Sequence, residues 1–147
     1  NYSNDYLGYN NISFSPQKVC IYSYNNYIKK YPDAIVVSNN ESIKYVVMNF
    51  VIKNDGSKDI MLNKLFLYFA AISFPTGWTN RGKFINVDSG KILKPNEQID
   101  VSMSFVVSPS MVVDRNMQKF LNSHFQLCLN VYPVKKILEF DTIEKNL

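Results

Sequence analysis

The sequence offers few residues that could catalyse a reaction. A catalytic nucleophile needs a base beside it, and that base is most often a histidine. The chain has one histidine, His124, and Ser123 is its neighbour in sequence, which does not make the two a catalytic pair. No Gly-x-Ser-x-Gly motif is present, and the Asp and Glu residues lie mostly at positions that turn formation explains. We therefore expect no catalytic residues and a protein that is not an enzyme.

The two cysteines, Cys20 and Cys128, are the other reactive side chains. Two thiols and one imidazole do not supply the ligands of the usual metal sites, so we expect no metal and no cofactor. Each cysteine is out of phase with the apolar residues of its segment, whereas an antibody-type disulfide shares the phase of the core. Two alternatives remain open: a Cys20–Cys128 disulfide, if their strands are neighbours, and two free, partly buried thiols.

Aromatic side chains are the main candidates for binding. Trp78 and Arg81 lie in a polar loop at residues 75–82, and seven tyrosines crowd the first 31 residues. Rigid amphipathic rings suit protein partners and sugar faces, and Trp and Arg are enriched at interface hot spots. We take Trp78, Arg81, Tyr22 and Tyr24 as candidate binding residues. The structural alternative is that the tyrosines cover sheet edges and that Trp78 closes one end of the core.

The elements that must position these side chains are β-strands. Residues 43–53 and 98–107 alternate between apolar and polar positions, and an apolar run at residues 60–74 lies between them. Turn sequences separate the three segments at residues 54–57 and 93–97, a pattern typical of antiparallel strands. The alternation predicts that these side chains are mostly buried: Val46, Met48, Phe50, Ile52, Leu65, Leu67, Ile99, Val101, Met103, Phe105, Leu127 and Leu129.

Further strand signals cover residues 17–24, 125–132 and 134–142, and residues 114–122 form the one helical candidate. About seven to nine short strands with frequent turns predict an all-β, antiparallel sandwich. At 147 residues the chain is most simply one domain. We expect an N-terminal arm at residues 1–11, a single sandwich domain at residues 12–143 and a C-terminal tail at residues 144–147.

A family resemblance rests on two turns. Asn54-Asp55-Gly56-Ser57 ends one predicted strand, and Leu93-Lys94-Pro95-Asn96-Glu97 opens a later one. This order resembles immunoglobulin-like modules of prokaryotic envelope and surface-appendage proteins, in which Asn-x-Gly ends a strand and Leu-x-Pro-Gly-Glu opens another. The resemblance covers residues 43–107 and departs from the motif at Asn96, where glycine is usual. It implies an immunoglobulin-like β-sandwich, and the soluble domains of archaellum and pilus accessory proteins are similar in size and low charge.

The charge and hydropathy of the chain limit the classes of partner that we expect. The net charge is +4, and basic residues come in isolated pairs such as Lys29-Lys30 and Lys135-Lys136, so we expect no nucleic-acid footprint. No apolar run reaches the roughly 18 residues of a membrane span. Only 19% of the residues are charged while Asn, Ser and Tyr are abundant, which fits A/T-rich coding or an exported surface.

These observations favour a non-enzymatic module that acts through a protein partner or self-association. The alternative is a carbohydrate-binding sandwich that uses exposed aromatic side chains on a glycan. We expect an extracellular or cell-envelope location, with a virion or the cytoplasm as alternatives.

Overall fold

The computed structural model describes residues 11–34, 43–71, 80–108, 112–130 and 136–147. Its strands are β1 (Ile12–Ser23), β2 (Lys44–Asn54), β3 (Ile60–Met61), β4 (Leu67–Ala71), β5 (Asn80–Arg81), β6 (Lys83–Phe84), β7 (Ile92–Leu93), β8 (Gln98–Val107), β9 (Phe125–Leu129), β10 (Lys136–Phe140) and β11 (Ile143–Asn146). Its helices are α2 (Tyr24–Lys30) and α3 (Met117–Leu121), with 3-10 turns at Leu62–Lys64 and Asp114–Asn116.

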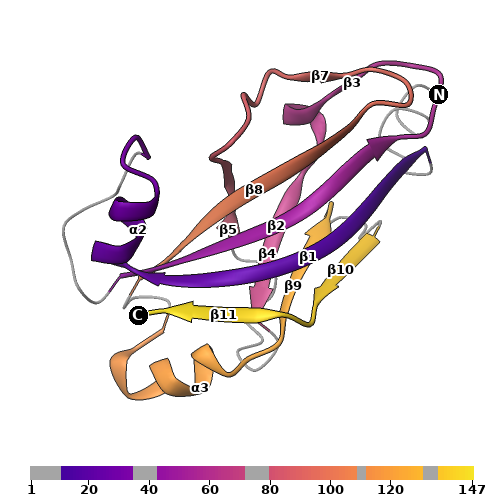
Figure 1. Ribbon diagram of the computed structural model, residues 1–147. Helices are drawn as coiled ribbons and strands as arrows, with labels where there is room; N and C mark the ends of the chain where they lie inside the picture. The colour runs from indigo at the N-terminus through magenta and orange to yellow at the C-terminus, as the bar shows by residue number, and fades with distance from the viewer. Residues whose placement is uncertain (1–10, 35–42, 72–79, 109–111, 131–135) are drawn as a thin grey trace.

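The strands form two stacked sheets and a small ribbon (Figure 1). Sheet 1 has the order β11-β1-β2-β8-β6, sheet 2 has the order β10-β9-β4-β5, and β3 pairs with β7. The orders β1-β2-β8-β6 and β10-β9-β4 are those of strands A-B-E-D and G-F-C in an immunoglobulin-type sandwich. The all-β sandwich is confirmed. Eleven strands lie in the described residues against an expected seven to nine, and β3, β5, β6 and β7 have two residues each.

The end of the chain differs from the expected tail. Residues 143–146 form β11, which adds to the edge of sheet 1 beside β1. This pair is parallel, with Val19 opposite Ile143, and the backbone N–H of Val19 donates to the carbonyl of Thr142 at 2.9 Å. The expectation of purely antiparallel sheets was therefore wrong here. The chain leaves β10 in sheet 2 and crosses to sheet 1, so no hairpin forces β11 to run antiparallel.

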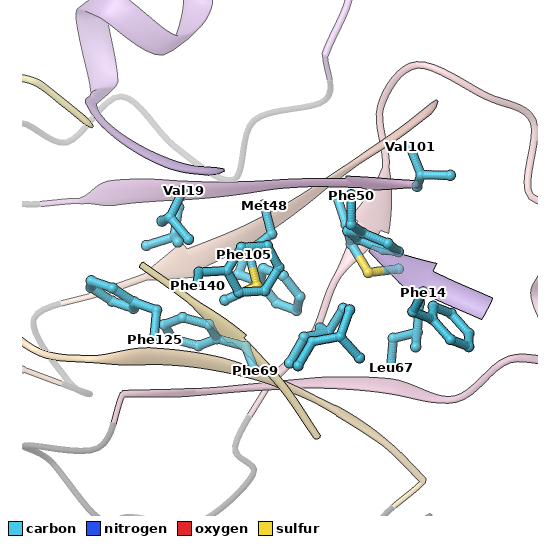
Figure 2. Packing of buried hydrophobic residues seen from close by; sticks show 14 of the residues in the cluster. Phe14, Val19, Met48, Phe50, Leu67, Phe69, Val101, Phe105, Phe125 and Phe140 are labelled. Atoms are coloured by element: carbon cyan, nitrogen blue, oxygen red, sulfur yellow. The ribbon is translucent and has the colours of Figure 1, made fainter. Parts of the chain in front are cut away.

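The core lies between the two sheets and matches the alternation of the sequence. Met48 of β2 lies opposite Met103 of β8, and Phe105 stacks on Phe69 of sheet 2 with ring centroids 5.1 Å apart. Figure 2 shows Met48, Phe105 and Phe69 between the two layers. All twelve residues predicted to be buried are buried except Ile99, which is partly buried and packs against the same cluster.

The two turns that carry the family resemblance dock onto each other. The Asn54 side chain is fully buried; its Nδ2 donates to the carbonyls of Lys58 and Leu93 at 2.8 and 2.9 Å, and its Oδ1 accepts from the N–H of Gly56. The Asn96 N–H donates to the Asn54 carbonyl at 2.7 Å. Asn96 has a φ of 68°, a conformation that glycine adopts most readily, which explains the glycine of the motif. The resemblance therefore rests on a structural unit.

The sequence pattern at residues 114–122 correctly predicted a helix, but α2 was missed. The predicted strand at residues 17–24 instead gives way at Ser23, whose side chain accepts a hydrogen bond from the N–H of Asn26 and caps α2. A helical signal was available, because residues 24, 27, 28 and 31 are apolar or aromatic at the spacing of one helix face.

Candidate binding site

A second cluster of buried side chains lies on the outer face of sheet 1, under α2. We call it the tyrosine cluster; with Tyr31 packed at its rim, its rings are Tyr22, Tyr24, Tyr27, Tyr31 and Tyr45. Tyr27 stacks on Tyr45 with ring centroids 4.0 Å apart and an angle of 3°. The Tyr27 hydroxyl contacts the Ser104 hydroxyl at 2.9 Å. These contacts fix α2 against the sheet.

A pocket of about 460 Å³ opens beside this cluster. We call it the Tyr22 pocket, and it is lined by Lys18, Cys20, Tyr22, Lys30, Tyr31, Asn49, Glu144 and Asn146. Strand pairing builds most of it, because alternate residues of β1 share one face. Cys20 lies opposite Glu144 of β11, Tyr22 lies opposite Asn146, and Lys18 lies opposite Asn49 of β2. Lys30 and Tyr31, at the end of α2, form the wall.

The charged groups of the pocket are two ammonium groups and one carboxylate. Lys18 Nζ donates to Glu144 Oε2 at 3.1 Å, and this hydrogen bond raises the pKa of Lys18. Lys30 has no ion pair within the described residues. The site therefore carries a net positive charge.

The neutral groups of the pocket are suited to hydrogen bonding. Asn49 Oδ1 accepts from the Ser102 hydroxyl at 2.6 Å, and its Nδ2 has no partner among the described residues. The Asn146 carbonyl accepts from Asn26 Nδ2 at 2.9 Å, which leaves the Asn146 side chain for other contacts. The Tyr22 ring lies edge-on to the partly exposed Tyr31 ring, with centroids 5.9 Å apart.

The thiol of Cys20 forms a buried wall of the pocket. Burial raises its pKa, and this effect exceeds the opposite effects of the Lys18 charge and of a hydrogen bond with Tyr22. Burial also raises the pKa of Tyr22. Because the thiolate is the nucleophilic form of cysteine, burial makes the Cys20 thiol less nucleophilic than an exposed cysteine.

The candidate binding residues from the sequence lie in different places. Tyr22 lines the pocket with 7% of its surface exposed, whereas Tyr24 is buried near Tyr45 and takes no part in the lining. Trp78 lies outside the described residues. Arg81 lies in β5 opposite Tyr68, and its side chain is not among those described. The lysines and amides of the pocket were missed, because the pairing of β1 with both β2 and β11 and the position of α2 bring them together.

The two cysteines are free and buried. Cys20 is on the outer face of sheet 1, and Cys128 of β9 is out of phase with the core residues of sheet 2. Cys128 Sγ donates to the Asn130 carbonyl at 2.8 Å, and burial raises its pKa to about 11. The core separates the two sulfurs, whereas a disulfide requires Cα atoms within about 7 Å. Of the two alternatives, free thiols are the one that the fold adopts.

A second candidate surface lies on the outer face of sheet 2. Ile137 of β10, Cys128 of β9 and Tyr68 of β4 are paired across three strands, and we call them the Ile137 row. Ile137 is 46% exposed and Tyr68 is partly buried, whereas Cys128 between them is fully buried, so the exposed part of the row is Ile137 and part of Tyr68. Among the described elements, β10 is one of the two edge strands of this sheet, and β5 is the other.

Potential metal ligands do not gather into a site in the part of the chain that the structure describes. No group of three or more His, Cys, Asp or Glu side chains gathers there in a way that could hold a metal ion. His124 is exposed just before β9. None of the described helices has the length and apolar character of a membrane span.

Comparisons with known proteins give a distant likeness. No family model matches the chain, and neither does any curated protein. Among solved structures, the chain is similar to the crystal structure of an uncharacterized β-sandwich protein from Clostridium difficile 630. The two are 10% identical with a TM-score of 0.49, over 92% of this chain and 83% of the other. A likeness this distant carries no argument about the site.

Proposed function

We propose that this protein is a non-enzymatic module that assembles through protein–protein contacts. The observation that carries the proposal is the Ile137 row at the edge of sheet 2. An edge strand presents unpaired backbone groups, and an exposed β-branched side chain there adds apolar contact area. Tyr68 adds an aromatic ring, the side-chain class most enriched in interface cores. A second copy of the chain is the partner to test first, since most soluble oligomers are homo-oligomers.

Replacement of Ile137 by glutamate tests this proposal. Ile92 of β7 is the matched control, because it is 43% exposed against 46% for Ile137 and lies in the separate β3-β7 ribbon. We expect sedimentation velocity to show concentration-dependent association of the unmodified protein, lost in Ile137→Glu and retained in Ile92→Glu. A protein that stays monomeric at every concentration, or association that survives Ile137→Glu, contradicts self-assembly through this edge.

The second candidate function is carbohydrate binding, and the Tyr22 pocket is the observation that favours it. Sugars are bound by aromatic faces together with amide and charged side chains, and Tyr31, Asn49 and Glu144 provide this combination. Titration with neutral and acidic monosaccharides, followed by NMR shifts of the pocket residues, tests it. The absence of any shift in the pocket would exclude this function.

We further propose that the domain is an immunoglobulin-like module of an envelope, a surface appendage or a virion. The docked turns at Asn54 and Asn96 support this relationship, since they match both halves of the motif except for Asn96, which takes the conformation that the glycine of the motif favours. Accessibility of an epitope-tagged protein to antibody on intact source cells tests the location. Labelling only after the cells are lysed would contradict it.

A further inference from the structure

We propose that the Tyr22 pocket binds an acidic sugar, a ligand that joins one carboxylate to several hydroxyl groups on a ring with an apolar face. The proposal rests on the carbohydrate-binding function above and specifies the ligand class. Four elements contribute to the pocket: β1, β2, β11 and the end of α2. Strand register holds the groups from three of these elements in place, which is the preorganisation that a specific site needs.

The net positive charge of the pocket favours an anionic ligand over a neutral one. Glu144 neutralises Lys18 at 3.1 Å, which leaves the Lys30 ammonium without a described ion pair at the rim. A carboxylate on the ligand would complete an alternating arrangement of charges with Lys30 and Lys18. Hydrogen bonds between charged groups are roughly twice as strong as neutral ones, so a ligand carboxylate gains most at this position.

The neutral side of the pocket fits hydroxyl groups. Asn49 Nδ2 is a donor without a described partner, the Asn146 side chain offers both a donor and an acceptor, and Glu144 offers acceptor oxygens. A hydroxyl group both donates and accepts, so it can satisfy amide and carboxylate side chains together. A bare inorganic anion cannot donate to Glu144 in this way.

Size and ring placement limit the ligand further. The volume of about 460 Å³ lies in the range of small-molecule sites, about 300–1,000 Å³, and is suited to one or two sugar rings. Tyr31 is held by Tyr22 and Tyr27, at centroid distances of 5.9 and 5.4 Å. Its partly exposed ring supplies the apolar surface on which the C–H face of a sugar can rest.

The test compares sodium glucuronate with glucose, acetate and inorganic phosphate, at equal ionic strength, by NMR titration of the labelled protein. We expect shifts confined to the pocket strands, with glucuronate binding at least about tenfold more tightly than glucose or acetate. Methyl glucuronide, titrated in parallel, distinguishes a free sugar from the end residue of a glycan chain. If it binds as tightly as glucuronate, the pocket accepts a sugar that is linked through its anomeric carbon.

Two neighbouring lysines provide the matched variants. Lys30→Met keeps the apolar stem of the side chain and removes the charge, and we expect it to weaken glucuronate binding about tenfold. Lys29→Met, an exposed neighbour outside the pocket lining, should leave binding unchanged. Both side chains are exposed, so the spectra should stay those of a folded protein.

The outcomes of these titrations distinguish specificity for an acidic sugar from carbohydrate binding in general. Glucose binding that matches glucuronate and ignores Lys30→Met overturns the acidic specificity and leaves carbohydrate binding standing. Acetate or phosphate that binds as tightly as glucuronate shows a general anion site and overturns both. No shift with any sugar at concentrations of about 10 mM, where a millimolar Kd would be evident, also overturns both.

Discussion

Asn54 is the single residue that joins most of the backbone at one end of the sandwich. Its side chain bridges the carbonyls of Lys58 and Leu93 and the N–H of Gly56, and its backbone pairs with Asn96 and Glu97. A buried amide that satisfies three backbone groups leaves them unpaired when it is removed, and each unpaired buried group carries a desolvation cost.

Asn54→Ala should therefore lower the free energy of unfolding by about 2–4 kcal/mol. Asn86→Ala is the control, because Asn86 also bridges two backbone groups, the Asp100 carbonyl and the Ser102 N–H, but at an exposed position where water can replace it. We expect less than about 1 kcal/mol there. Urea unfolding of both variants measures the difference, and equal losses would show that burial of Asn54 is not the cause.

At the scale of elements, the fold depends on the points where the chain crosses from one sheet to the other. The chain passes from β5 in sheet 2 to β6 in sheet 1 at Gly82. A Cβ atom at Gly82 would lie 2.6 Å from Phe105 Cε1 and 2.7 Å from Met103 Cγ. The crossing therefore passes directly over core side chains, and the absence of a side chain is what lets β6 pair with β8.

Gly82→Ala should destabilise the protein by about 1–3 kcal/mol, since the core side chains must move to admit the methyl group. Gly90→Ala is the matched control, because the nearest atom to its added Cβ, Asp88 Oδ1, is 3.5 Å away. That change should stay within about 0.5 kcal/mol. Thermal and urea unfolding measure both changes in the free energy of unfolding. If Gly82→Ala leaves this free energy unchanged, the core can accommodate a methyl group at the crossing, which contradicts the prediction.

At the scale of the whole molecule, the two buried thiols lie on opposite faces of the sandwich. A thiol whose pKa is raised by folding favours the folded state while it is protonated. Its contribution to stability is complete below the unfolded pKa and is lost as pH rises toward the folded value. For Cys128 this window runs from about 9 to about 11, and Cys20 shifts in the same direction.

The unfolding free energy should thus fall as pH rises above 9, and Cys128→Ala should make this decline shallower by up to about 1.4 kcal/mol per pH unit. Urea titrations across the alkaline range measure the slope for both proteins. At neutral pH, a disulfide reagent should react with Cys128 only as fast as the protein opens, because this thiol is fully buried. Rapid labelling of Cys128 in the folded protein, or an unchanged slope in the variant, would contradict this account.

The sequence alone determined the central strands β2 and β8 and the face that each of them buries. Alternation in residues 43–53 and 98–107 predicted the core, because the period of a strand is a local property that hydrophobic burial enforces at every second residue. The turns at Asn54 and Asn96 were visible for the same reason, since turn formation depends on a few adjacent residues.

Tertiary structure decided what the sequence left ambiguous. The predicted strand at residues 17–24 gives way to α2 after Ser23, where the Ser23 cap and the packing of Tyr27 against Tyr45 favour the helix. The Tyr22 pocket depends on a C-terminal strand that crosses from sheet 2 to pair with β1, more than a hundred residues earlier in the chain. Such long-range pairing depends on how the whole chain packs around its core. No local sequence pattern could therefore predict that Lys18 lies beside Glu144, or that Tyr22 lines the pocket whereas Tyr24 does not.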